Sequence, residues 1–433
     1  MNKIDFKYSL NEVPSPKDLI LLGLQWLVIT IPIVIIIGGV VAGIHFDTFS
    51  EQVIYLQKLF FVTAVTVLMQ VYWGHGLPLI VGPATVLLVG ITSSQAGSID
   101  SVYFSIMVCG LVLAVLSITG LFDYLKKLFT PRVVAGTLIL IAFTLTPMIT
   151  DLVTTTMGKG TGFLNLIFSL AIIFAMFAAN RFLSGIWKST LNIWAILLGT
   201  LIYNFLFSVD ISGRGNYGFA PALFSGFTLK PTFETGTIIS FLICFLALAV
   251  NDLGSIQSVN QLIDPGKGKK RVTRGITVTG LGNILSGFFG VIGPVNFSLS
   301  PGVIVSTRCA SRYTLVPMGL GLLAISFFPG IIAFMGAIPP AVIGAILIYI
   351  MCSQIAAGLT IALNSSEEFA FEHGLVIGLS LMLSIIVSFL PQDTLNTFPL
   401  ILRPILGNGF VVGVISLLVM ERLIGRNNNR RKV

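Results

Sequence analysis

Long apolar runs separated by short polar connections fill almost the whole chain of 433 residues. An α-helix needs about 20 mostly apolar residues to cross a bilayer, so this pattern predicts a series of membrane-spanning segments. We expect fourteen of them, at Leu19–Ile44, Gln52–Tyr72, Leu77–Thr92, Val102–Phe122, Val133–Leu152, Leu164–Ala179, Leu191–Phe207, Thr237–Ile263, Val272–Gly293, Val295–Arg308, Tyr313–Met335, Ile343–Leu363, Leu375–Leu390 and Ile401–Ile424.

Two of these segments, the third and the tenth, are interrupted by proline and glycine. The third contains Pro78, Gly82 and Pro83, and the tenth follows Pro294 and contains Pro301. Proline removes a backbone donor and glycine weakens a helix, so neither segment is expected to cross as one full helix. A matched pair of broken segments in the two halves of a chain points to the binding site of a transporter. Two ordinary proline-kinked helices are the alternative.

The layout of the segments predicts an internal repeat. The polar, glycine-rich stretch 208–236 leaves seven segments on each side of it. Because seven is odd, the second half enters the membrane from the opposite face, which is the condition for an inverted repeat.

Composition and charge exclude a soluble protein and place the termini. Only 10% of the residues are charged and the mean hydropathy is +0.97, whereas soluble proteins carry roughly 25% charged residues. Of the 25 Lys and Arg residues, Lys58 falls within a segment and all others lie on the face of the N-terminus, except Lys159, Arg214, Lys230 and Arg403. This bias predicts cytoplasmic termini, and it explains the net charge of +8 without nucleic-acid binding.

Polar residues deep in apolar segments are the candidates for chemistry, because each is costly there without a partner. The eighth segment carries Asn251 and Ser255 on one face, with Asp252 beside them. Asp252 is the one carboxylate that we place at mid-depth. It is either a proton-relay or ligand group, or a structural group bonded to a neighbouring helix or to a broken-segment N–H. Gln25 is either a polar contact between helices or a substrate contact, and Tyr349 is either a packing residue or a site residue.

Other chemistries find no support in the sequence. The nucleotide-binding pattern G-x-x-x-x-G-K-[ST] is absent, so we expect no ATP-driven pumping. The Cys and His residues are scattered, so we expect no metal site, no cofactor and no enzyme activity.

Several short stretches are spread over nearly the whole chain: Gly23-Leu24-Gln25-Trp26, Gly82-Pro83-Ala84-Thr85, Leu128-Phe129-Thr130-Pro131-Arg132, Gly280-Leu281 with Ser286-Gly287-Phe288-Phe289-Gly290, Gly302 with Thr307-Arg308, and Ile338-Pro339-Pro340 with Gly344. Together they resemble the nucleobase–ascorbate transporter family, the uracil/xanthine permeases. The end of the chain, Leu402-Arg403-Pro404-Ile405-Leu406-Gly407-Asn408-Gly409, looks especially like the bacterial purine permease branch of that family.

The resemblance implies an all-α polytopic fold of fourteen segments in 7+7 inverted repeats, with short antiparallel β-strands in segments three and ten. It also implies proton symport, elevator-type motion and a homodimer. The implied parts are a core domain (19–122 and 237–335), a gate domain (123–207 and 336–424), a cytoplasmic N-terminus (1–18), an extracytoplasmic loop (208–236) and a basic cytoplasmic tail (425–433).

The site residues that the resemblance implies are partly replaced in this chain. The family's substrate-binding glutamate falls at Asn251 and its histidine one turn later at Ser255. In segment ten, the acidic or glutamine position is Leu299 and the asparagine is Ser300, and in segment one a histidine is replaced by Trp26. The candidate substrate contacts are Gln25, Trp26, Ala84, Thr85, Asn251, Ser255, Phe297, Ser298, Leu299, Ser300 and Tyr349. Asp252 is the candidate to take over the proton role.

We therefore expect a multi-pass transporter of the inner (plasma) membrane that moves a purine or related heterocycle, a small molecule, together with protons. A small-anion carrier on the same fold, like the sulfate and bicarbonate carriers, is the first alternative. A membrane enzyme or receptor is the second, and it lacks a catalytic constellation.

Overall fold

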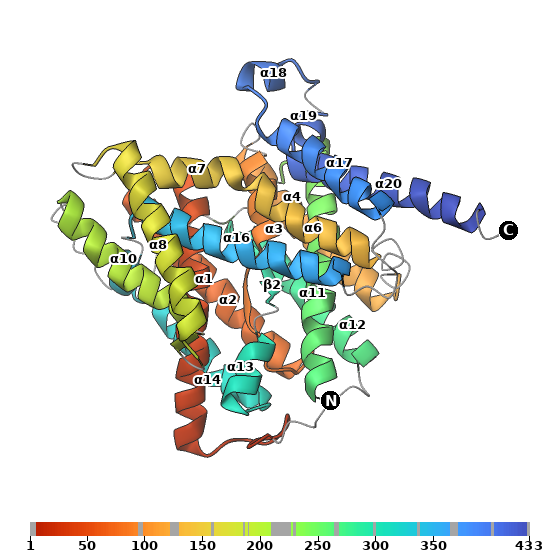
Figure 1. Ribbon diagram of the computed structural model, residues 1–433. Coiled ribbons are helices and arrows are strands. Elements are labelled where there is room, and N and C mark those ends of the chain that lie inside the picture. Colours follow the sequence, from red (N-terminus) through yellow and green to blue (C-terminus); the bar gives the residue numbers. More distant parts are fainter. Residues whose placement is uncertain are drawn as a thin grey trace.

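The computed structural model describes residues 6–93, 98–121, 130–156, 160–184, 187–188, 190–208, 227, 231–263, 268–297, 300–335, 338–363, 371–399 and 402–430. Within this part the chain is almost entirely helical, with one two-stranded sheet (Figure 1). Eight described helices are long and apolar enough to cross a membrane, or nine if one bent pair is counted. The protein is therefore a mostly helical, multi-pass membrane fold, whereas the fourteen-segment 7+7 arrangement stays a prediction.

The first half of the chain runs through nine described elements. They are α1 (Pro16–His45), α2 (Phe49–Tyr72), β1 (Val81–Pro83), α3 (Thr85–Ser93), α4 (Ile99–Ile118), α6 (Pro131–Thr144), α7 (Thr146–Thr154), α8 (Gly162–Phe182) and α10 (Leu191–Phe207).

The second half begins with a long helix and again reaches a short strand before a short helix. Its described elements are α11 (Thr235–Ile263), α12 (Gly268–Phe289), β2 (Pro294–Asn296), α13 (Ser300–Thr307), the 3₁₀ turn η3 (Arg312–Thr314), α14 (Leu315–Ser326), α15 (Pro329–Met335), α16 (Pro340–Leu363), α17 (Phe371–Ser388), α18 (Gln392–Asn396), α19 (Arg403–Leu406) and α20 (Gly409–Arg430).

Three predicted segments are divided in the structure. The fifth divides at Leu145 into α6 and α7, because Pro147 in the first turn of α7 lacks the N–H that would continue the helix. The eleventh bends by 97° where α15 starts at Pro329. In the fourteenth, a continuous helix begins only at Gly409, after the short α19, because the Asn408 side chain caps α20.

The helices form two groups by their contacts. In the first group, α1, α2, α4, α11, α12 and α14 pack against one another around β1, β2 and α3. In the second group, α16 contacts α6, α7, α8 and α10, while α17 and α20 pack on each other and on α6. Figure 1 shows α6 and α16 passing across the front of α11 and the strands.

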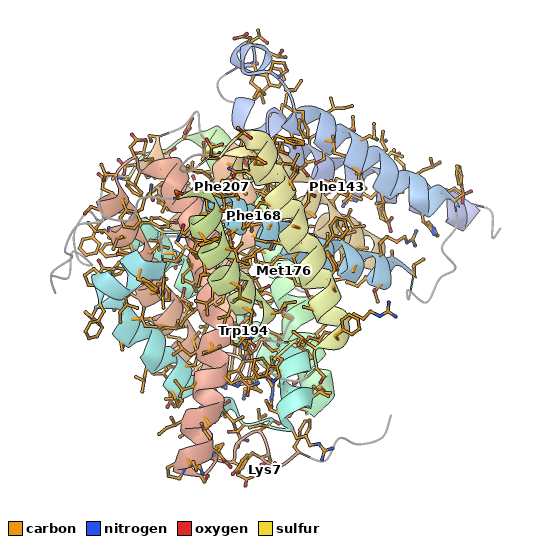
Figure 2. All side chains as sticks on the ribbon, turned by 60° about the vertical axis from the view of Figure 1, so that its left-hand side comes forward. Lys7, Phe143, Phe168, Met176, Trp194 and Phe207 are labelled. Carbon is orange, nitrogen blue, oxygen red and sulfur yellow. The ribbon has the colours of Figure 1, made fainter. Side chains whose placement is uncertain are left out.

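The second group has an aromatic contact of its own. Phe168 of α8 lies against Tyr203 and Phe207 of α10, with ring centroids 5.2 and 6.0 Å from Phe168 (Figure 2). Edge-to-face rings at such separations add to the energy of burial. These contacts hold α8 against α10.

The contact between α4 and α12 depends on glycine. A Cβ atom added at Gly280 of α12 would lie 2.7 Å from the carbonyl oxygen of Gly110 in α4. Small residues let helix backbones approach closely in membranes, where packing rather than water drives association. This contact brings α12, and the polar residues on it, next to α4 and α11.

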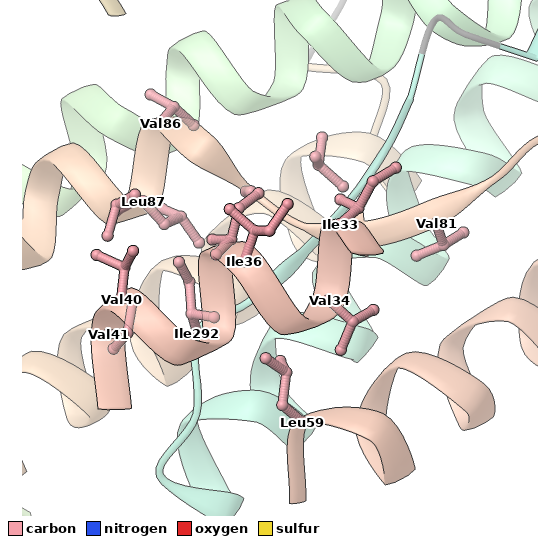
Figure 3. Close-up of a cluster of buried hydrophobic side chains, with 14 of the residues drawn as sticks. Ile33, Val34, Ile36, Val40, Val41, Leu59, Val81, Val86, Leu87 and Ile292 are labelled. Carbon is pink, nitrogen blue, oxygen red and sulfur yellow. The ribbon is translucent and has the colours of Figure 1, made fainter. Parts of the chain in front are cut away.

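An apolar cluster surrounds the strands. Ile33 and Ile36 of α1, Val81 of β1, Leu87 of α3 and Ile292 are all buried there (Figure 3). These side chains come from both halves of the chain. The cluster therefore holds the two broken segments together at the centre of the first group.

Candidate functional site at the paired broken segments

The two broken segments pair with each other as antiparallel strands. Val81 lies opposite Asn296, Gly82 opposite Val295, and Pro83 opposite Pro294. Two further backbone bonds extend the pair, from Ala84 N to Gly293 O at 2.9 Å and from Phe297 N to Ile80 O at 2.8 Å. The strands predicted in segments three and ten are thus present, and they satisfy polar groups that proline leaves without helical partners.

Glycine at position 82 is required by the side chain that covers it. A Cβ atom there would lie 2.8 Å from the Phe297 ring and 3.5 Å from Ile33. The Phe297 ring therefore packs so close to the β1 backbone at Gly82 that a side chain there would force one of them to move.

Asp252 of α11 anchors β2. Its Oδ1 accepts hydrogen bonds from Asn296 N at 2.9 Å and from Asn296 Nδ2 at 2.6 Å. Its Oδ2 accepts a hydrogen bond from Thr279 Oγ1 of α12 at 2.7 Å. The carboxylate is fully buried, and all three of these hydrogen bonds use it as an acceptor, as an ionised carboxylate requires.

The bonds of Asp252 belong to a closed ring of five residues, which we call the polar ring: Gln70, His75, Asp252, Thr279 and Asn296. Gln70 Nε2 donates to Thr279 Oγ1 at 3.0 Å, and Gln70 Oε1 accepts from His75 N at 3.3 Å. His75 Nε2 lies 3.0 Å from Asn296 Oδ1, which closes the ring. The ring joins α2, the connection before β1, α11, α12 and β2.

The hydrogen bonds define the tautomer of His75. Leu77 N donates to Nδ1 at 2.9 Å, so Nδ1 is the acceptor and Nε2 carries the proton that Asn296 Oδ1 accepts. His75 is thus a neutral imidazole. Each of its two ring nitrogens holds one of the broken segments.

The helices that follow the strands are half-length. α3 begins at Thr85 directly after β1, and α13 begins at Ser300 after β2. Pro301 opens α13 rather than interrupting it, because a missing N–H costs nothing in the first turn. The Ser300 hydroxyl accepts from Ile80 N at 3.0 Å and so links the start of α13 to the other broken segment.

Thr85 contacts the second helix group. Gln354 of α16 donates from Nε2 to Thr85 Oγ1 at 3.2 Å. A second polar contact between the groups joins Asn408 Nδ2 to Ser240 Oγ of α11 at 3.1 Å, with both residues fully buried.

Other predicted site residues lie elsewhere. Trp26 is buried and donates from its indole to Thr314 Oγ1 at 3.0 Å, so it joins α1 to η3 and takes no part in the polar ring. The Tyr349 ring packs on Phe177 at 5.3 Å, within the second group. Ser298 and Leu299 lie outside the described residues. Among the described residues, no group of three or more His, Cys, Asp or Glu side chains could hold a metal ion.

Gln25 lies in a groove of about 450 Å³ rather than beside Asp252. The groove runs between α1, the end of α13 and the start of α10, and it is lined by residues that include Gln25, Thr190, Thr307 and Cys309. Lys7 and Tyr8 of the N-terminal segment border it, and both side chains bond to Asp18. Gln25 Nε2 is buried and has no hydrogen-bond partner in the described part of the chain.

The Ser255 hydroxyl, close to Asp252 on α11, is available for further hydrogen bonds. Its side chain is 1% exposed, and its hydroxyl has no hydrogen-bond partner among the described residues. Asn251 is half-buried on the same face of α11.

Sequence reasoning missed four members of the site: Gln70, His75, Thr279 and Gln354. Their one signal is a polar side chain in or beside an apolar segment, which many residues of this chain share. Only the hydrogen bonds separate them from the rest.

Comparison with known proteins identifies the family of this chain. The profile of the permease family that includes the xanthine and uracil permeases matches residues 17–393. The chain belongs to this family. It is therefore a transporter-type membrane protein and not an enzyme.

Two relatives of this permease are named as a nucleobase transporter and a xanthine permease. The nucleobase transporter PlUacP of Paenibacillus larvae is 25% identical over 410 residues, which cover 90% of this chain and 92% of that protein. The xanthine permease of Bacillus subtilis is 26% identical over 394 residues, 88% of each. Among solved structures, the transmembrane domain of the cyanobacterial bicarbonate transporter BicA superposes with a TM-score of 0.61 at 19% identity, covering 86% of this chain and 96% of that domain. That likeness concerns the fold alone.

Proposed function

We propose that this permease is a secondary active transporter of a nucleobase, a purine or related heterocycle, with the substrate bound beside the paired strands. The observation that carries the proposal is the pair of strands, in which the polar ring anchors β2 through Asp252 and each strand leads directly into a half-length helix, α3 or α13. Helix starts present backbone donors that can bind the carbonyl groups of a base. Relatives that are named for nucleobase and xanthine transport support the same substrate class.

The transport mechanism in this proposal is proton symport by elevator-type alternating access. Protonation of Asp252 would replace an acceptor with a donor and would weaken the hold on Asn296 or Thr279, so a proton at this carboxyl would loosen β2. The first helix group would act as the moving core and the second as the gate. Two features support a state that is open toward the cytoplasm. The Asn408–Ser240 bond joins the two helix groups near the start of α11, on the expected extracytoplasmic side. The groove at Gln25 lies beside the N-terminal segment, on the expected cytoplasmic side.

The same proposal includes an inner (plasma) membrane location with cytoplasmic termini, contact with membrane lipid, and a homodimer. The bias of Lys and Arg supports this orientation.

Binding and uptake test the substrate class. We expect adenine, guanine, xanthine, hypoxanthine or uracil to raise the unfolding temperature of the purified permease, because a ligand that binds only the folded state stabilises it. The same base should compete for uptake in proteoliposomes under an imposed proton gradient. If sulfate or bicarbonate stabilises the protein and no base does, the substrate class is wrong.

A small-anion carrier is the second candidate. Two half-helix starts that meet at the strand pair favour this function, since helix N-termini attract anions. The buried Asp252 carboxylate opposes it, because an anion bound nearby would be repelled.

A further inference from the structure

Gln354 differs from the other hydrogen-bonding side chains of α16. The hydroxyls of Ser353 and Thr360 donate to carbonyls of their own helix, at 3.1 and 2.8 Å. Gln354 instead donates to Thr85, where β1 passes into α3. Its side chain therefore extends from the second helix group to the start of α3, beside the strand pair.

The bonding of Gln354 is incomplete. Its Oε1 atom is buried and accepts no hydrogen bond from any described residue. A primary amide offers two donors and one acceptor, and the bond at 3.2 Å uses one donor. A buried carbonyl left without a partner destabilises the fold, so an apolar residue would fit this position better unless a ligand completes the bonding.

A second open group lies on α11, in the first helix group. The Ser255 hydroxyl on α11 is buried and without a partner in the described chain, and α11 contacts both α3 and β2. Open hydrogen-bonding groups are thus present on both helix groups, each on a helix that contacts α3. A polar ligand that contacts both helices would complete the bonding of both groups.

We propose that Gln354 is a substrate contact on the second helix group. Its amide forms hydrogen bonds with the polar edge of the base, and these bonds replace its bond to Thr85. The proposal rests on the proposed function. An amide pairs bidentately with neighbouring donor and acceptor atoms, as on the edge of adenine or on the N–H and C=O of a keto purine. A substrate bound in this way would join the two helix groups and would stabilise the state in which they are close.

Substitutions of Gln354 separate a contact from a packing role. We expect Gln354→Leu to raise the Kd for the best-bound base of the wild type by about tenfold, since it removes both members of the pair. Gln354→Glu offers only acceptors, so it should shift the binding order toward guanine, whose edge presents two neighbouring N–H donors, and away from bases that present a carbonyl there. Ser353→Ala, one residue away and bonded only within its helix, is the matched control and should leave Kd and order unchanged.

The measurement is isothermal titration of the purified full-length protein with adenine, guanine, hypoxanthine, xanthine and uracil. If the variants keep the affinities and the order of the wild type, Gln354 is no substrate contact, although the proposed function stands. If the wild type binds no base, both proposals fall. If Gln354→Leu or Gln354→Glu does not fold, Gln354→Asn replaces it, because this variant keeps the amide but shortens the side chain by one methylene. We then expect Gln354→Asn to weaken binding of the base. Unchanged binding by that variant overturns the proposal.

Discussion

Asp252 and Asn296 are joined by two hydrogen bonds to the same oxygen atom, one from the backbone amide at 2.9 Å and one from the side-chain amide at 2.6 Å. One carboxylate oxygen thus holds both the backbone and the side chain of the last residue in β2. The other oxygen accepts from Thr279, so the same carboxylate also links β2 to α12.

Asp252→Asn should therefore alter both stability and coupling. The new amide would place N–H groups against the donors of Asn296 or Thr279, which leaves at least one buried donor without an acceptor. We expect a lower unfolding temperature, slower uptake, and uptake that no longer falls as the external pH rises. Base uptake into proteoliposomes, measured from mildly acidic to mildly alkaline pH, checks this.

Thr279→Val is the control for that experiment. It removes the bond to the carboxylate and the bond that Thr279 accepts from Gln70, but it keeps the acid. We therefore expect a loss of about 1–2 kcal/mol in the free energy of unfolding and a retained pH profile. If Asp252→Asn transports with the rate and pH profile of the wild type, Asp252 has only a structural role.

Gly82→Ala should impair the site without disturbing the rest of the fold. Its Cβ would lie 2.8 Å from the Phe297 ring, which must move away from β1. We expect a loss of about 1–3 kcal/mol in stability, as for other overpacked positions, together with weaker base binding in a thermal-shift titration.

Gly39→Ala, in α1, provides the matched comparison for Gly82→Ala, because no atom lies within 4 Å of its added Cβ. It should be neutral or slightly stabilising. If the two variants have equal stability and equal base binding, the Phe297 contact does not constrain the strand.

Gly280→Ala tests the contact between α4 and α12. The added Cβ would lie 2.7 Å from a backbone oxygen of Gly110, so a whole helix must move rather than a side chain. We expect a loss of about 1–3 kcal/mol in stability, measured by thermal unfolding in detergent. Gly378→Ala in α17, where the added Cβ meets nothing within 4 Å, should cause no loss. A stable Gly280→Ala protein would mean that the helices can separate at little cost.

Ser240 and Asn408 test the motion between the helix groups. In a cysteine-free background, we expect a short bis-methanethiosulfonate reagent to cross-link Ser240→Cys with Asn408→Cys, because the native Ser240 Oγ and Asn408 Nδ2 atoms lie 3.1 Å apart. If the two groups must separate here during transport, the cross-link should abolish uptake, and a reductant should restore it.

Ser240→Ala tests the same contact without a cross-link. It removes the bond to Asn408 but keeps the α20 cap that the Asn408 side chain forms with Phe410 N and Val411 N. We expect this variant to fold and to transport. Full uptake by the cross-linked pair would contradict a motion between the groups at this contact.

The broken segments were predictable because their cause is local. Pro78, Pro83 and Pro294 lack backbone donors wherever they occur, and no fold can restore them. Asp252 stood out for an equally simple reason, since a carboxylate within an apolar segment is costly in any arrangement unless it is partnered. The membrane class followed from composition alone.

The partners were not predictable, because they join residues far apart in the chain. His75 and Asn296 are separated by 221 positions, and Gln354 and Thr85 by 269. A single-sequence pattern carries no signal at such distances. Trp26 shows the same limit, since only the packing of α1 on η3 turns its indole toward Thr314 and away from the polar ring.

The sequence by itself thus determined that the chain crosses the membrane, where its helices break, and which acid is buried, because each depends on the chemistry of one residue or one short stretch. Only the tertiary structure decided which donors surround that acid and which side chains face the strands, because buried polar groups take whichever partners the packing of distant helices brings within hydrogen-bonding distance.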